Sequence, residues 1–138
     1  MLRRRLFAAL PLALALVGSP ALSAEEGARK QVGQYVDIQP VGVPVVLDGR
    51  LQNYIFVYVR LNLVAGADTS RWRAKEPYFR DALVRLAHEA SFTLPNDRDK
   101  VDAAKLTAAF GQKVTAITGP GVVRSVVVTS QIASRSRP

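Results

Sequence analysis

The sequence predicts one small α+β domain in which two helices pack on one face of a small, mainly antiparallel sheet. Three patterns carry this prediction. Apolar residues alternate along 35–63, recur at helical spacing within 68–118, and form a valine-rich run over 122–132. The predicted order of elements is therefore strand, strand, helix, helix, strand.

The first region is predicted to hold two neighbouring strands. Residues 35–47 include Pro40 and Pro44, which lack a backbone N–H, so we expect an edge strand or a bulged strand. Asp48 and Gly49 indicate a hairpin turn. In the second strand, alternation places Leu51, Ile55, Val57, Val59, Leu61 and Leu63 on the core face, and Gln52, Tyr54, Phe56, Tyr58, Arg60 and Asn62 on the other face.

The first helix is expected to follow a break at 65–67 and to run to about Ser91. Asp68, Thr69 and Ser70 are the candidates for its N-cap. Pro77 lies inside this span and should kink the helix or divide it into two pieces, the second with the proline in its first turn. The predicted buried stripe consists of Phe79, Leu83, Leu86, Ala87 and Ala90.

A polar loop over 93–100 is predicted to lead into the second helix. Asp99 or Asp102 would cap this helix, and the glycines in 119–121 would end it. The β-branched run over 122–132 indicates a strand that is buried on both faces or central in the sheet. The buried face of the second helix should comprise Leu106, Phe110, Val114 and Ile117.

Residues 1–24 have the pattern of a secretory signal peptide. Three arginines precede an apolar run over 6–17 and a stretch of small residues that ends at Ala24. Twelve helical residues cover about 18 Å, whereas the hydrocarbon core of a bilayer is about 30 Å thick. We therefore expect export to the periplasm with cleavage, or an inner-membrane anchor facing the periplasm where the segment is not cleaved.

About 114 residues remain after this segment, which is the usual size of a single domain. We expect a linker over 25–33, a folded domain over 34–133 and a disordered basic tail over 134–138. The net charge of +8 includes Arg3, Arg4 and Arg5, so the mature domain carries about +5. This charge either serves solubility or favours anionic lipid headgroups, cell-wall polymer or an acidic protein face, and export argues against nucleic acid as a partner. Because the chain has no cysteine and a single histidine, a disulfide framework and the usual zinc ligands are excluded, and we expect no cofactor.

The sequence contains no recognisable catalytic motif. His88 lies beside the apolar stripe of the first helix, where a local pair with Arg85 or another helix neighbour explains it, and no G-x-S-x-G motif is present. Asp97, Asp99 and Asp102 cluster near a helix start, where capping accounts for them. We expect a non-enzymatic protein, with a small carboxylate-based envelope hydrolase as a distant alternative.

Two groups of residues are candidates for contacts with a partner or a second copy. Tyr54, Phe56 and Tyr58 lie on the less apolar face of the second strand, where exposed aromatic side chains favour association. Trp72 and Arg73 belong to a stretch that alternates cations with an aromatic residue. That stretch could engage membrane headgroups or an acidic partner, or could simply form a local cation-π contact.

Several stretches of this chain resemble the periplasmic domain of the flagellar basal-body-associated FliL family. They are 35–38 with the prolines that follow, the long strand over 54–63, and Pro77 followed by Arg80, Asp81, Ala82 and Leu83. The resemblance covers about 100 residues and implies a fold similar to stomatin and prohibitin domains. FliL proteins normally carry a full transmembrane helix, and the short apolar run at 6–17 departs from that pattern.

The resemblance implies a role at the flagellar motor. The expected partners are further copies of the chain in a ring-like homo-oligomer, the peptidoglycan-binding subunit of the stator, and the basal body, with the membrane surface as a further contact. The expected function is support of the stator and of motility. The alternative is an envelope scaffold or anionic-surface binding module of the same fold that is unrelated to flagella.

Overall fold

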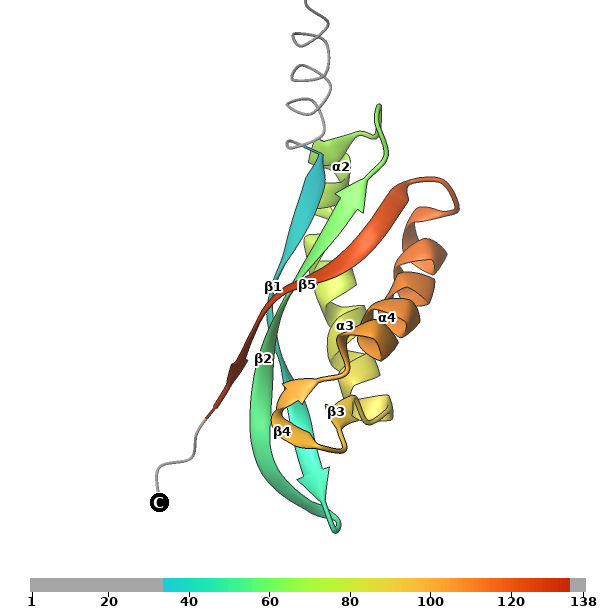
Figure 1. Cartoon of the computed structure of the whole chain (residues 1–138). Helices are drawn as coiled ribbons and strands as arrows, with labels where there is room; N and C mark the ends of the chain where they lie inside the picture. The colour runs from blue at the N-terminus through green and yellow to red at the C-terminus, as the bar shows by residue number, and fades with distance from the viewer. Residues whose placement is uncertain (1–33, 135–138) are drawn as a thin grey trace, which may run out of the picture.

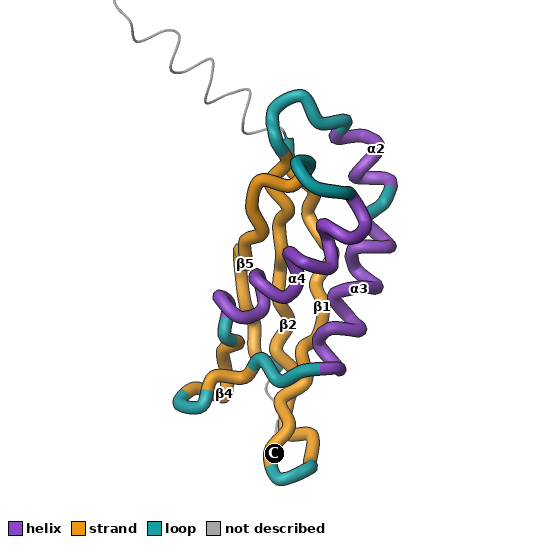
Figure 2. The backbone as a smooth tube through the Cα atoms, turned by 90° about the vertical axis from the view of Figure 1, so that its right-hand side faces the viewer, coloured by secondary structure: helices purple, strands orange, loops and turns teal. Residues whose placement is uncertain are grey.

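Strand β2 (Arg50–Leu63) is the central strand of the sheet. The computed structural model describes residues 34–134, in which β1 (Tyr35–Leu47) and β5 (Val123–Ala133) pair with the two sides of β2, both antiparallel to it. Helices α3 (Glu76–Glu89) and α4 (Ala103–Thr118) cover one face of this sheet, and α2 (Thr69–Ala74) lies beside the start of β1 (Figures 1 and 2). The predicted α+β class is confirmed, whereas the likeness to stomatin and prohibitin domains stays a prediction.

The hairpin between β1 and β2 follows its sequence signals. Asp48 and Gly49 both have positive φ, 50° and 73°, which is the backbone of the tight turns that suit a hairpin. The register of β1 shifts between Ile38 and Val41, so the predicted edge strand with a bulge is confirmed. Gln39, inside that bulge, accepts a hydrogen bond from Arg80 Nη1 at 2.7 Å and so links the bulge to α3.

Leu51 does not share the buried face of β2, although alternation placed it there. It pairs with Val46 next to the turn, beyond a second register shift, and both side chains are 52% exposed. Figure 2 shows the reason, because the hairpin extends past the ends of the helices. The remaining predicted core residues of β2, from Ile55 to Leu63, are buried.

Strand β5 is an edge strand, which corrects the prediction of a central strand buried on both faces. In the described part of the chain it pairs with β2 alone, and none of its residues is buried. Val126 and Val128 pack partly against the core, whereas Val127 between them is exposed on the opposite face. β-Branched residues favour any pleated position, so a valine run predicts a strand without predicting its place in the sheet.

The first predicted helix is divided at Lys75, where α2 ends and α3 begins with Pro77 in its first turn. Asp68 is the N-cap of α2, and its side chain accepts a hydrogen bond from the Arg71 amide at 3.1 Å. Both expectations are confirmed. Of the predicted buried stripe, Ala90 is exposed because it lies beyond the end of α3, and the buried members are Phe79, Leu83, Leu86 and Ala87.

The predicted polar loop over 93–100 is wrong, because a small hairpin occupies it. Strands β3 (Thr93–Leu94) and β4 (Asp97–Val101) pair there, and the buried side chains of Phe92 and Val101 hold its base against the core. Asp102 caps α4 by accepting from the Lys105 amide at 3.1 Å. Leu106, Phe110 and Val114 of α4 are fully buried, Ile117 is 36% exposed, and Gly119 ends the helix with a φ of 81°.

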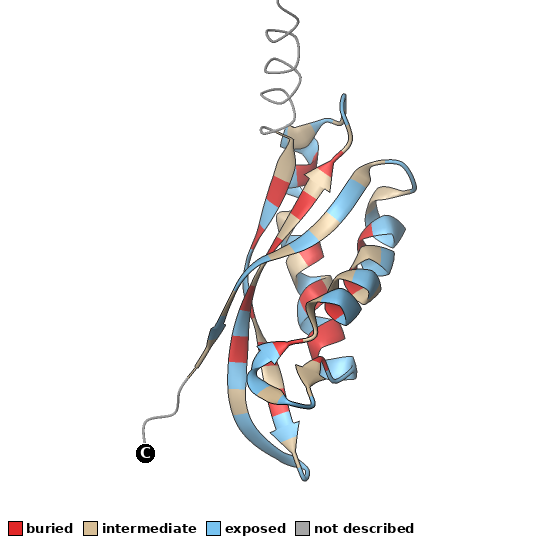
Figure 3. Ribbon diagram, viewed as in Figure 1, coloured by how far each residue is buried: buried red, intermediate tan, exposed pale blue. Residues whose placement is uncertain are grey.

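The hydrophobic core lies between the sheet and the helices. Figure 3 shows buried segments on both the sheet and the helices. Within 34–134 the buried side chains are all apolar and lie between Val36 and Val114. The Ser134 amide still donates to the Tyr54 carbonyl at 2.8 Å. The predicted signal segment 1–24, the linker up to residue 33 and tail residues 135–138 lie outside the described residues.

Candidate functional site: the outer face of the sheet

The face of the sheet that points away from the helices is the main uncovered surface of the domain (Figures 1 and 3). Alternation along β2 directs Tyr54, Phe56, Tyr58, Arg60 and Asn62 to this outer face. The first three lie in the half nearer the hairpin turn, and the last two lie near the N-terminal end of β1. The outer face is therefore apolar at one end and polar at the other.

The apolar half carries a row of apolar side chains, which we name the apolar strip and define as the half-buried Pro44 and the exposed Tyr54, Phe56 and Ile132. Tyr54 pairs with Pro44, and Phe56 has Ile132 as its partner on β5. The side chains of Tyr54, Phe56 and Ile132 are 38, 42 and 53% exposed. A contiguous apolar patch on a sheet face is typical of a contact surface, because water is excluded when a partner covers it.

Gly42 shapes the apolar strip from β1. A Cβ atom added at Gly42 would lie 3.3 Å from Cδ1 of Tyr54 and 3.5 Å from Cε1 of Phe56. The two rings thus lie against the glycine backbone, which has no side chain to hold them away from the sheet. A surface with flat rings on it can approach a partner closely.

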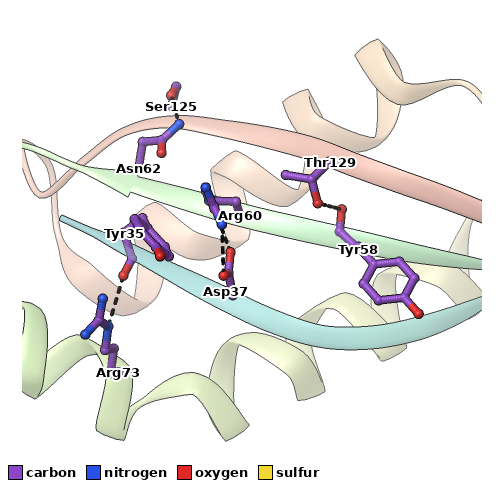
Figure 4. A network of polar contacts seen from close by, with 8 residues as sticks. All are labelled: Tyr35, Asp37, Tyr58, Arg60, Asn62, Arg73, Ser125 and Thr129. Atoms are coloured by element: carbon purple, nitrogen blue, oxygen red, sulfur yellow. Dashed lines mark hydrogen bonds and ion pairs between the residues drawn. The ribbon is translucent and has the colours of Figure 1, made fainter. Parts of the chain in front are cut away.

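The polar half is organised by an ion pair across β1 and β2. Arg60 donates to both carboxylate oxygens of Asp37, Nε to Oδ1 at 2.7 Å and Nη2 to Oδ2 at 3.0 Å (Figure 4). These hydrogen bonds raise the pKa of the Arg60 guanidinium above its ordinary value. On the β5 side, Asn62 Nδ2 donates to Ser125 Oγ at 3.0 Å, so polar contacts connect the three strands.

Two arginine side chains contact the ring of Tyr35, the first residue of β1. The guanidinium carbon of Arg60 lies 3.9 Å from the centroid of the Tyr35 ring, and that of Arg73 lies 5.4 Å from it. Arg73 Nε also donates to the Tyr35 carbonyl at 3.2 Å (Figure 4). These contacts of Arg73 therefore attach α2 to Tyr35, where the sheet begins.

The residues proposed as contacts from the sequence do not form one site. Tyr54, Phe56 and Tyr58 lie together on the outer face, with Tyr58 half-buried, whereas Trp72 and Arg73 lie on α2. Trp72 is only 8% exposed, and its ring centroid lies 6.5 Å from that of Phe79. It stabilises the domain from inside and does not offer a surface to a partner.

Sequence reasoning missed two contributors to the outer face. Ile132 could be assigned to the apolar strip only once β5 was known to pair with β2. Gly42 has no side chain, so the sequence alone gives no sign of a role. Its contact with the rings of Tyr54 and Phe56 depends on the register of β1 against β2. A signal did exist for the pair of Asp37 and Arg60, since both stand on the polar side of their strands.

The groups that could suggest chemistry have local structural partners. Nδ1 of His88 lies 2.8 Å from the Val84 carbonyl oxygen of its own helix, and Arg85 pairs with Asp81 at 3.0 Å. Asp97 accepts from the amide of Asp99 at 2.9 Å. Among residues 34–134, no three histidine or acidic side chains are grouped so that they could hold a metal ion.

Comparison with known proteins does not assign this chain to a family. No family model matches the sequence, and no curated protein matches it. Over the stretch from residue 34 to residue 134, no helix has both the length and the apolar character needed to cross a membrane.

Removing the charge of Asp37 should have a small effect. Asp37→Asn is expected to lower the free energy of unfolding by about 0.5 kcal/mol, because the Arg60 and Asp37 side chains are 37% and 55% exposed and water screens the pair. Urea denaturation at low and high salt measures this difference, which should shrink as salt rises. Asp99→Asn is the control, since that exposed carboxylate forms no ion pair in the described part of the chain. An equal loss in both variants would contradict the assignment.

Proposed function

We propose that this protein is a non-enzymatic, FliL-like component of the bacterial envelope that self-associates beside the flagellar stator and supports motility. The observation that carries the proposal is the apolar strip on the uncovered face of the sheet. A monomer gains nothing from exposing Tyr54, Phe56 and Ile132 in a row, whereas a second copy that covers them removes apolar surface from water. The resemblance to FliL supplies the flagellar setting.

The two edges of the sheet differ in how well they could pair with a further strand, and β5 is the better suited of the two. Pro40 and Pro44 deprive β1 of two backbone donors, and the bulge at Gln39 interrupts its edge further. Strand β5 has eleven residues, contains no proline, and pairs with β2 alone among the described strands. A closed ring needs two different surfaces on each copy, and the β5 edge and the apolar strip form such a pair.

The test uses the protein in its host cell. A C-terminally tagged chain is purified from cell envelopes after cross-linking, and mass spectrometry identifies its partners and its N-terminal residue. We expect untagged copies of the same chain together with the peptidoglycan-binding stator subunit. We also expect deletion of the gene to reduce swimming or swarming, with recovery when the gene is restored.

Recovery of an unrelated envelope complex, with unchanged motility after deletion, would overturn the flagellar proposal. The second candidate would then be a module of the same fold that docks on an anionic surface. Arg71 and Lys75 favour that candidate, because neither forms an ion pair with a carboxylate within residues 34–134. The N-terminal residue found by mass spectrometry decides separately whether residues 1–24 are cleaved.

A further inference from the structure

The end of the domain at which the chain enters β1 carries a surface that the self-association proposal does not use. We name it the cationic end and define it as Arg71 and Lys75 around α2, with Tyr78 in the first turn of α3. Arg73 connects it to the sheet by its hydrogen bond to the Tyr35 carbonyl. Figure 1 shows α2 beside the start of β1, so the cationic end and the point of chain entry coincide.

Within residues 34–134 the two cations of this surface contact aromatic rings and form no ion pair with a carboxylate. The guanidinium carbon of Arg71 lies 4.9 Å from the Trp72 ring centroid, and Nζ of Lys75 lies 5.1 Å from that of Tyr78. They stand four residues apart at the C-terminal end of α2, with Lys75 as its C-cap. Both residues are exposed, so their charges are available to an external anion.

The neighbouring carboxylates are engaged elsewhere. Asp68 caps α2 through the Arg71 amide. Oε1 of Glu76 accepts from the Gln39 amide at 3.0 Å and lies 3.9 Å from Arg80 Nε. Both acids thus serve the fold, and the exposed side chains of Arg71 and Lys75 have no ion-pair partner among the residues that the structure describes.

Tyr78 gives this surface its interfacial character. It is 62% exposed, the largest exposure among the exposed large hydrophobic side chains of the described residues. A tyrosine ring with a hydroxyl tip, flanked by long cationic side chains, suits the boundary between water and the acyl chains of a membrane. Such a ring adds a contact that does not depend on charge, whereas the cations respond to anionic headgroups.

Where residues 1–24 are not cleaved, the order of the chain brings this surface close to the membrane. Residues 6–17 are the apolar run of the sequence, and the chain that carries them joins the domain at its cationic end. We propose that the cationic end docks on the headgroups of anionic phospholipids, with Arg71 and Lys75 at the phosphates and Tyr78 at the interface. The inference rests on the envelope location in the proposed function and is independent of the flagellar role.

The test is sedimentation of residues 25–138 with phospholipid vesicles, since the core of the described residues, from Val36 to Val114, lies inside this segment. Vesicles of phosphatidylcholine are compared with vesicles that also contain phosphatidylglycerol. Each cation near an anionic surface strengthens binding about fivefold, so Arg71→Gln with Lys75→Gln should weaken binding to the anionic vesicles about 30-fold. Binding should also fall as salt rises, because the headgroup charges are screened.

The matched control is Arg98→Gln with Lys100→Gln, which removes the same charge from the exposed β4 strand. We expect a loss at least about tenfold smaller than at the cationic end, because a pair distant from the headgroups contributes only through net charge. Tyr78→Ala should weaken binding equally at low and high salt, since its contact is not ionic.

Equal losses in the two charge variants would overturn the proposal, as would failure of the unaltered segment to bind anionic vesicles. Binding to an acidic polypeptide such as poly-glutamate, without binding to vesicles, would assign the surface to an acidic protein instead. These outcomes are distinct from failure of the flagellar proposal, which is decided by the partners recovered from cells and by motility.

Discussion

Phe79→Ala is expected to lower the free energy of unfolding by about 3–5 kcal/mol, the range for removing a large aromatic side chain from a packed core. Phe79 is completely buried on α3, where its ring contacts that of Trp72. The smaller side chain leaves a cavity that the sheet and the helices can only partly close. Because small domains are stable by about 5–15 kcal/mol, this single change should leave a marginal fold. Urea denaturation followed by circular dichroism measures the loss.

The adjacent residue provides the control. Tyr78→Ala should change the free energy of unfolding by no more than about 0.5 kcal/mol, because that side chain is largely exposed. The comparison tests the orientation of α3, since successive residues on a helix point about 100° apart. A larger loss at Tyr78 than at Phe79 would mean that the helix presents a different face to the sheet.

Signals that act over a few residues predicted much of the fold. Asp48 and Gly49 specify the turn between β1 and β2, Asp68 caps α2, and Pro77 fits the first turn of a helix that must therefore begin anew. The spacing of Leu106, Phe110 and Val114 identified the buried face of α4. In each case the residues that determine the structure lie close to one another in the sequence.

Features that depend on distant parts of the chain were predicted less well. The position of β5 at the edge is decided by which strand it pairs with, and a valine run is compatible with either position. Residues 93–100 look like a loop because they are polar, yet they form a hairpin whose base is held by Phe92 and Val101. Tertiary contacts override local preference in both cases.

In the candidate site, too, local patterns predicted more than features that depend on distant parts of the chain. Alternation along β2 placed Tyr54 and Phe56 on one face, and that prediction needed no knowledge of other strands. The cations on either side of Trp72 made it a candidate contact residue, whereas the helix turns its ring inward onto Phe79. Ile132 completes the apolar strip only through the register of β5 against β2.

Phe56→Lys with Ile132→Lys is expected to weaken self-association of the protein at least about 100-fold. Burying a Phe or Ile side chain in a contact contributes about 1.5–3 kcal/mol, and each lysine would also have to lose water to enter the interface. The two residues pair across β2 and β5, so both charges would stand within the apolar strip. Light scattering after size-exclusion chromatography, over a range of protein concentrations, measures the change.

Val46→Lys with Leu51→Lys is a matched control, because these residues also pair across two strands and are equally exposed, but lie at the hairpin tip outside the apolar strip. Both double variants should keep the thermal stability of the unaltered protein within a few degrees, since the replaced side chains are exposed. Loss of assembly in the first variant alone places the contact on the apolar strip. Equal losses would indicate association through any exposed apolar residue, and assembly that survives in both would place the interface away from the outer face, leaving the β5 edge as the surface to alter next.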